Sequence, residues 1–275
     1  MANGADFFQF FWPVHENGYV WRDARKDMEG NTSMEPYLTL KKPLTDQRMY
    51  EPLTKKSGLF RTFASLRPTK SEIANFANRY GMLGGDVDAF IVPDASPSPV
   101  EVGESLSKWK NEIILMKNAL TLWDFAMLND RKGLAQHIVW EGTGMIKCRM
   151  TRFRGCVASR ELRAHLLEKF ALGDLVKPAL YQVNLFINES IKSRVTLRNM
   201  WDQDYKHHNL HALPNGLIGA LWLQFANAFN GTKQFRQCSC GEWFEISPPI
   251  TRKTRKHCSS ACKQKAYRSK KEITQ

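Results

Sequence analysis

Four cysteines near the C-terminal end constrain the fold of this chain more than any other feature. Cys238, Cys240, Cys258 and Cys262 form two close pairs, Cys-x-Cys and Cys-x₃-Cys, with seventeen residues between the pairs. Two such pairs can supply the tetrahedron of soft ligands that zinc prefers. A bound zinc ion can stabilise a segment that is too short to bury a core of its own. The spacing therefore predicts a four-cysteine Zn²⁺ site.

The residues around the pairs agree with this prediction. Gly241 permits a tight turn directly after the first pair. Cys258 and Cys262 are four residues apart, so their sulfur atoms share one face of a predicted helix, with Ser259 as the expected N-cap. The first pair has one intervening residue, where zinc knuckles usually have two. His257 is therefore an alternative ligand.

The same segment carries most of the positive charge of the chain. From Lys233 to Lys271 there are eleven basic and two acidic residues, a net charge of +9 out of a total of +13. A cationic surface held in shape by a metal suits the phosphates of nucleic acid. The predicted nucleic-acid-binding residues are Arg252, Lys253, Arg255, Lys256, Lys263, Lys265, Tyr267, Arg268, Lys270 and Lys271. The ring of Tyr267 either stacks on a base or packs against the zinc core. Alternatively, the whole run is a solvated charged face.

The rest of the chain predicts a mostly helical body. Thr69 and Glu72 form a capping box before an apolar stripe that stops at Gly81, which predicts a helix over this range. Further helices are expected at about 104–129, 159–172, 177–191 and 213–229, with strands at 19–22 and 37–40 and a hairpin at 137–150. The expected fold class is mainly α with a minor β part (α+β), followed by a small zinc finger.

Two domains are expected on this basis. Residues 1–232 form a mostly helical N-terminal domain, and residues 233–275 form a basic zinc-finger module, called the cysteine module below. No stretch approaches the ~20 apolar residues of a membrane span, and no basic segment precedes the N-terminal aromatic run. We therefore expect a cytoplasmic protein without a membrane partner. In that compartment Cys148 and Cys156 are expected to be plain small apolar side chains.

A second polar cluster in the sequence allows an enzymatic function as an alternative. Asp202, Asp204, His207 and His211 lie in one short stretch. If this stretch were helical, the two histidines would share a face, as in a metal-dependent nuclease or hydrolase. The alternative is a polar loop before a helix that begins near Leu213. There is no glycine-rich phosphate loop and no Gly-x-Ser-x-Gly motif, which favours a protein that is not an enzyme.

The tryptophan side chains are expected to pack mainly in the hydrophobic core. They fall mostly on apolar helical faces, although together they could line a small-molecule pocket. The four in question are Trp109, Trp123, Trp201 and Trp222.

Several segments together resemble a known family. They are residues 58–64, 76–81 and 221–225, and then 238–244 and 255–259 around the cysteines. They are similar to bacterial proteins that join an ABATE-type helical domain to a treble-clef zinc finger of the CGNR type. Where that family carries Cys-Gly-Asn-Arg, this chain has Cys262-Lys263-Gln264-Lys265, which indicates a sister group.

The resemblance implies a transcription regulator. It implies a zinc-bound finger whose helix, from Cys262 onward, faces double-stranded DNA. It also implies a helical domain that senses an unknown small-molecule effector. Because one finger reads few bases, specificity calls for a homodimer or a second contact surface. A finger that binds another protein as an adaptor is the third class of function that fits the cysteines.

Overall fold

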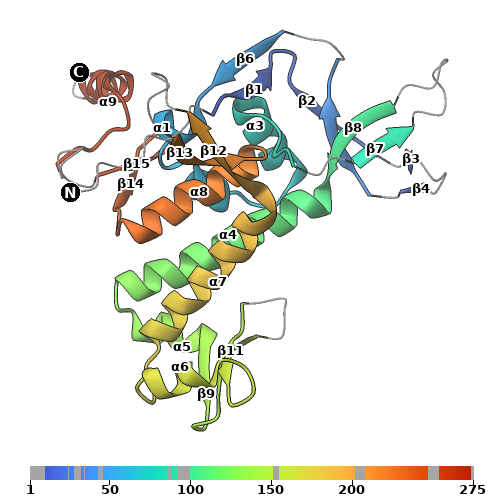
Figure 1. Ribbon diagram of the computed structural model, residues 1–275. Coiled ribbons are helices and arrows are strands. Elements are labelled where there is room, and N and C mark those ends of the chain that lie inside the picture. Colours follow the sequence, from blue (N-terminus) through green and yellow to red (C-terminus); the bar gives the residue numbers. More distant parts are fainter. Residues whose placement is uncertain are drawn as a thin grey trace. The chain divides into compact units, whose positions relative to one another are not determined.

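The computed structural model describes residues 10–23, 25–27, 32–33, 35–42, 46–85, 88–91, 100–150, 155–201, 208–246 and 254–273 (Figure 1). The chain divides into two compact units. The first combines Met1–Ile113 with Ile191–Gln275, and the second is Ile114–Ser190. Two long helices, α4 (Leu106–Met127) and α7 (Val176–Arg194), run across the unit boundaries. The cysteine module belongs to the first unit in this division, and a domain boundary at residue 232 stays a prediction.

Among its described residues, the first unit contains four antiparallel sheets. The largest has six strands in the order β2 (Tyr19–Arg22), β5 (Tyr37–Leu40), β8 (Val100–Ser105), β7 (Asp88–Ile91), β3 (Arg25–Asp27) and β4 (Thr32–Ser33). The others are pairs: β1 (Trp12–His15) with β6 (Gln47–Tyr50), β12 (Val195–Trp201) with β13 (His208–Pro214), and β14 (Phe235–Gln237) with β15 (Trp243–Glu245).

These sheets overturn the predicted fold class. The protein is a mixed α and β structure, and the expectation of a mainly α fold with a minor β part is wrong. The strands at 19–22 and 37–40 were predicted, and they pair with each other. Several of the remaining strands are only two to four residues long, and the pairs β1–β6, β5–β8 and β3–β7 join segments more than 30 residues apart, so these strands leave little local periodicity. The stretch expected as a loop or helix near residues 201–211 belongs instead to β12 and β13 where it is described.

The helices of the first unit are α1 (Pro52–Lys55), α2 (Leu59–Ala64), α3 (Lys70–Tyr80), α8 (Leu217–Asn230) and α9 (Ser260–Ile273), besides the first part of α4 and the end of α7. Helices α2, α3, α4 and α8 contribute the rings of an aromatic core. The predicted start of α3 is confirmed, because the Thr69 hydroxyl accepts a hydrogen bond from the Glu72 amide at 3.4 Å. Gly81 ends the helix with a φ of 90°, a conformation that suits glycine.

Helix α8 is buried along nearly its whole length and joins distant parts of the chain. The ring of Phe225 stacks on that of Phe60 in α2, with their centroids 5.6 Å apart. The buried side-chain amide of Gln224 donates to the carbonyl of Pro52 at 2.6 Å and to that of Lys56 at 2.9 Å. Its oxygen accepts from the Phe60 amide at 3.3 Å. This helix therefore completes the core that α1 and α2 begin.

The second unit is built around a small three-stranded sheet. Its elements are α5 (Arg131–His137), β9 (Ile138–Glu141), β10 (Met145–Cys148), β11 (Cys156–Ser159) and α6 (Ala164–Lys169), with the adjoining parts of α4 and α7. The predicted hairpin is confirmed as the pair β9–β10. Cys148 is buried, as expected of a small apolar side chain.

The tryptophans divide into two groups. Trp109, Trp123 and Trp222 are fully buried, which confirms the prediction of core packing for these three. Trp201 is 54% exposed, so the same prediction is wrong for it. Among the described residues, no helix combines the length and the apolar character needed to cross a membrane.

Candidate metal centre and basic surface

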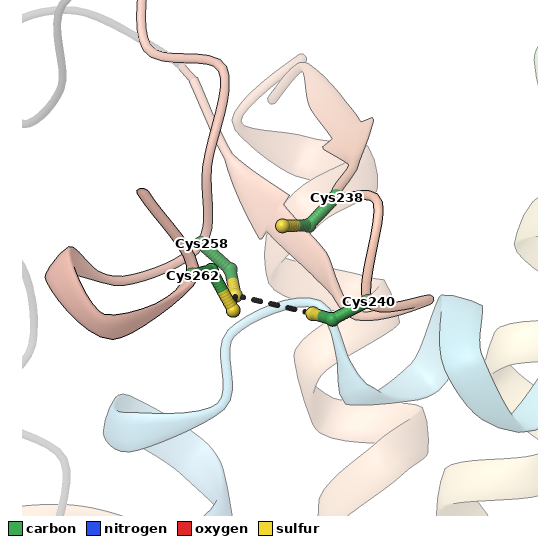
Figure 2. Close-up of side chains that lie close together, drawn as sticks. All are labelled: Cys238, Cys240, Cys258 and Cys262. Atoms are coloured by element: carbon green, nitrogen blue, oxygen red, sulfur yellow. Dashed lines mark hydrogen bonds between the residues drawn. The ribbon is translucent and has the colours of Figure 1, made fainter. Parts of the chain in front are cut away.

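The four predicted cysteines lie together and point toward one another (Figure 2). Their sulfur atoms are all within 4.8 Å of each other. The Sγ of Cys258 lies 3.5 Å from that of Cys240 and 3.4 Å from that of Cys262. A disulfide would need about 2.05 Å, whereas four thiolates at about 2.3 Å around one zinc ion would lie about 3.8 Å apart. The group can hold one metal ion.

Short-range hydrogen bonds place both cysteine pairs. The amide of Cys238 donates to the carbonyl of Glu242 at 2.8 Å, and that of Gly241 donates to the carbonyl of Cys238 at 2.9 Å. Gly241 has a φ of 89°, which glycine adopts without strain. At the second pair, the Ser259 hydroxyl accepts from the amide of Cys262 at 3.2 Å, so the predicted N-cap of α9 is confirmed.

The protonation of these thiols is uneven. Burial raises the pKa of Cys238, but hydrogen bonds from the amides and thiols of Cys240 and Cys258 outweigh it and lower the pKa to about 6. Burial and the neighbouring cysteines raise the pKa of Cys258 to about 12. Burial also raises the pKa of Cys240. A thiolate in this group disfavours ionisation of the thiols beside it, because a second negative charge would lie close to the first. A divalent cation would remove this restriction.

Arg255 and His257, both predicted as functional residues, lie next to the second cysteine pair. The guanidinium of Arg255 donates to the carbonyl of His257 at 2.8 Å and to that of Cys258, and it lies 4.9 Å from the centre of the Phe244 ring. Arg236 donates to the Arg255 carbonyl at 2.8 Å. Arg255 therefore fixes the loop that leads to the second cysteine pair. His257 is not part of the sulfur group, and its buried Nδ1 has no hydrogen-bond partner among the described residues.

Glu242 attaches the first cysteine pair to the helices of the first unit. Its carboxylate is buried and accepts a hydrogen bond from the Tyr80 hydroxyl. It also forms ion pairs with Lys56 Nζ at 3.1 Å and with Arg79 at 2.7 Å. Burial raises the pKa of Glu242, but the hydrogen bond from Tyr80 and the charges of Lys56 and Arg79 outweigh it and hold the pKa below its ordinary value. We call these four residues the Glu242 clasp.

The sequence did not predict the Glu242 clasp. One signal was present, since Glu242 is one of only two acids among eleven basic residues. The other acid, Glu245, is also buried and pairs with Lys233 at 3.1 Å. Both acids of this segment are thus engaged by cations within the first unit, and neither contributes negative charge to the exposed surface of the cysteine module.

The basic side chains around the second pair are mostly exposed. Lys256, Lys263, Lys265, Tyr267 and Arg268 are exposed, whereas Arg255 is half-buried. The expectation that Tyr267 packs against the metal core is wrong, because its side chain is 72% exposed. Of the other predicted residues, Arg252 and Lys253 lie outside the described part of the chain, and Lys270 and Lys271 are described only as backbone of α9.

A hollow opens at the start of α9. Its volume is about 410 Å³, and it is lined by Thr254, Arg255, Lys256, His257, Ser259, Ser260 and Lys263. No carboxylate occurs between residues 254 and 268. The partial positive charge of a helix N-terminus adds to that of the lysines here. The hollow therefore has the electrostatic character of an anion site.

The alternative cluster near residues 201–211 gains no support. Asp202, Asp204 and His207 lie outside the described residues. His208 and His211 are described, and they lie on β13 at positions whose side chains point to opposite faces. The cysteine group is the only set of potential metal ligands found among the residues that the structure describes.

Comparison of the chain with models of protein families, with curated proteins and with solved structures gave no match. The resemblance to ABATE and CGNR proteins accordingly stays a prediction. What can be said of the site comes from its geometry: four cysteines from two separate turns meet closely enough to hold one metal ion.

Proposed function

We propose that this protein binds nucleic acid through its basic surface and that a zinc ion on Cys238, Cys240, Cys258 and Cys262 holds that surface in shape. The observation that carries the proposal is the convergence of the four sulfur atoms at the base of a cationic helix. Duplex DNA bound by a transcription regulator is the form of this function that the sequence resemblance implies.

The choice of zinc follows from the ligands. Four thiolates around one ion favour zinc or iron–sulfur chemistry over magnesium or calcium, which prefer oxygen ligands. A structural zinc site is closed by four protein ligands in a tetrahedron. The separations of 3.4 and 3.5 Å between neighbouring sulfur atoms are close to what a single tetrahedral ion requires.

The choice of nucleic acid follows from the charge distribution. The two acids of the segment from Lys233 to Lys271 are buried against cations, while Lys256, Lys263 and Arg268 are exposed. A surface with several cations, in a stretch without a carboxylate between residues 254 and 268, attracts a polyanion that releases its counterions. The exposed ring of Tyr267 is available for stacking on a base.

The first experiment tests the metal. Purified full-length protein is expected to contain one zinc ion per chain by elemental analysis. The Cys258→Ser variant is expected to lose both the zinc and the affinity for nucleic acid. A metal-free protein that still binds nucleic acid with full affinity would refute the structural role of the ion.

The second experiment tests the basic surface without touching the metal ligands. Affinity for a labelled duplex is measured by fluorescence anisotropy at several salt concentrations. Replacing Lys263 and Arg268 with alanine should lower the slope of log K against log[salt] by up to about 1.8, because each lost phosphate contact accounts for about 0.9. The control replaces the exposed Lys41 and Lys42, which removes the same charge elsewhere. Equal effects of the two double substitutions would refute the proposal.

A further inference from the structure

The four cysteines of the metal group differ in their access to solvent. Cys240 is exposed, Cys258 and Cys262 are half-buried, and Cys238 is buried. The two cysteines of the second unit are buried or half-buried. A Cβ added to Gly241, the residue after Cys240, would meet no atom of the described residues within 4 Å, its chain neighbours aside. Cys240 is therefore the most accessible cysteine of the chain, and the turn that carries it faces open space.

Cys258 lies beside this exposed sulfur atom. The Sγ atoms of Cys240 and Cys258 are 3.5 Å apart and come from different segments, the turn after β14 and the loop before α9 (Figure 2). A disulfide between them requires the two atoms to approach by about 1.5 Å, for which the open turn leaves room. Cys262 lies 3.4 Å from Cys258, but neither of these two is as accessible as Cys240.

The charge around the pair favours reactive sulfur. Arg255 donates to the carbonyl of Cys258, Lys263 is exposed on the first turn of α9, and no carboxylate occurs between residues 254 and 268. On the side of the first pair, the carboxylate of Glu242 is already engaged by the cations of the Glu242 clasp. The thiolate is the form of cysteine that oxidants attack, and exposure in a positively charged environment makes that attack easier.

We propose that Cys240 is an oxidation site at which hydrogen peroxide inactivates the cysteine module, with Cys258 as the resolving thiolate. Bound zinc keeps its sulfur ligands deprotonated. The Cys240 thiolate attacks the peroxide, which leaves a sulfenic acid on Cys240 and releases one hydroxide. The Cys258 thiolate then attacks that sulfur, forms the disulfide and expels a second hydroxide. The two sulfur atoms together lose two electrons, and the peroxide gains them.

The disulfide removes two of the four zinc ligands. Cys238 and Cys262 alone do not complete the tetrahedron of a structural zinc site, so the ion is released. This inference rests on the proposed function, because the module then loses the ion that holds its basic surface in shape. A dithiol reductant reverses the step by thiol–disulfide exchange, which restores both thiols and leaves the reductant as a disulfide. Zinc can then bind again.

The test treats zinc-loaded full-length protein with hydrogen peroxide, beside a sample without peroxide. A chromophoric chelator should record one zinc ion released per chain, and mass spectrometry of the digested protein should find a disulfide between Cys240 and Cys258. In a separate sample, dimedone present during the reaction should label Cys240. Dithiothreitol and zinc should restore the lost affinity for the labelled duplex. Cys156→Ser, at a half-buried cysteine outside the group, is the matched control and should release zinc like the wild type.

A second variant separates the exposed thiol from the metal site. Cys240→His keeps a nitrogen ligand for zinc, as in sites of three cysteines and one histidine, and removes the sulfur that peroxide meets first. It should release zinc more slowly than the wild type, and release at the wild-type rate would overturn the proposal. If this variant does not retain zinc, the disulfide and dimedone positions in the wild type decide the question.

The outcomes separate this inference from the proposed function. If the wild type holds zinc and binds the duplex, but peroxide releases no zinc or forms a different disulfide, the oxidation site is refuted and the proposed function stands. If the purified protein holds no zinc, both fail. If peroxide releases zinc through the disulfide between Cys240 and Cys258 while the zinc-loaded protein binds no nucleic acid, the oxidation site stands and the proposed function fails.

Discussion

Removing one hydroxyl group from Tyr80 tests how the cysteine module is joined to the rest of the first unit. The Tyr80→Phe substitution deletes the hydrogen bond to the Glu242 carboxylate. The ring itself keeps its contacts, with its centroid 4.8 Å from that of Phe76. Because Tyr80 is buried, water cannot replace the lost donor from its side. The change therefore isolates one part of the Glu242 clasp.

The expected cost follows from the chemistry of that bond. A hydrogen bond to a charged group contributes about 1.5–3 kcal/mol to the free energy of unfolding. The side chains of Lys56 and Arg79 are 39% and 56% exposed, so their ion pairs with Glu242 are screened and contribute less. They still satisfy the carboxylate after the substitution, which places the expected loss near the lower end, about 1.5–2 kcal/mol.

Urea denaturation of the zinc-loaded chain measures this loss, with metal release followed by a chromophoric chelator. Tyr181→Phe is the matched control, because the hydroxyl of Tyr181 makes no hydrogen bond among the described residues. Tyr181→Phe should lower the free energy of unfolding by less than about 0.5 kcal/mol. If Tyr80→Phe costs no more than the control, or leaves the urea dependence of metal release unchanged, then Glu242 does not tie the module to the body and the reasoning is wrong.

Three further predictions address other parts of the first unit. Gly58→Ala should lower the free energy of unfolding by about 1–3 kcal/mol, because the added Cβ would overlap the Trp243 carbonyl. Gly144→Ala should leave it nearly unchanged, because the Cβ there meets only ordinary contacts. Thermal melts compare the two variants. Burial raises the pKa of Glu104 above its ordinary value, so the native state holds this proton more tightly than the unfolded chain does. The free energy of unfolding of the wild type should therefore fall relative to Glu104→Gln as the pH rises from about 4.5, and a constant difference in urea titrations would contradict this. Removing the metal with a chelator should expose the amides of β14, β15 and the start of α9 to hydrogen exchange without changing those of the second unit, and a uniform change would contradict the placement of the site.

The features that the sequence predicted correctly depend on residues close together in the chain. The cap at Thr69 and the stop at Gly81 are read from one short segment, and they fix α3. The pairing of β9 with β10 follows from one turn. The cysteine site spans a longer loop. The short spacing within each cysteine pair and the tetrahedral geometry that zinc prefers nevertheless leave few ways to arrange the four sulfur atoms. In each case a local pattern is enough to determine the structure.

The features that the sequence failed to predict depend on distant partners. Glu242 is surrounded by charge of its own segment, yet its partners Tyr80, Lys56 and Arg79 lie far earlier in the chain. Trp201 was predicted to be a core residue together with the tryptophans on apolar helical faces, and this prediction was wrong. Its exposure follows from its position at the last residue of β12, whereas Val195 at the first residue packs against the buried cluster of Leu53, Ala220 and Leu223. No short pattern in this polar stretch indicates such an extended strand.

The dependence of α1 and α2 on α8 has a consequence for biosynthesis. About 165 residues separate Phe60 from Phe225, whose rings stack in the finished core. At roughly 5–20 residues per second, the ribosome needs on the order of ten seconds or more to deliver the second ring after the first. During that interval the ring of Phe60 lacks both Phe225 and Phe235, and the surface around it resembles those that chaperones shield. The second unit, whose sequence is continuous, can complete its own packing before the first unit closes.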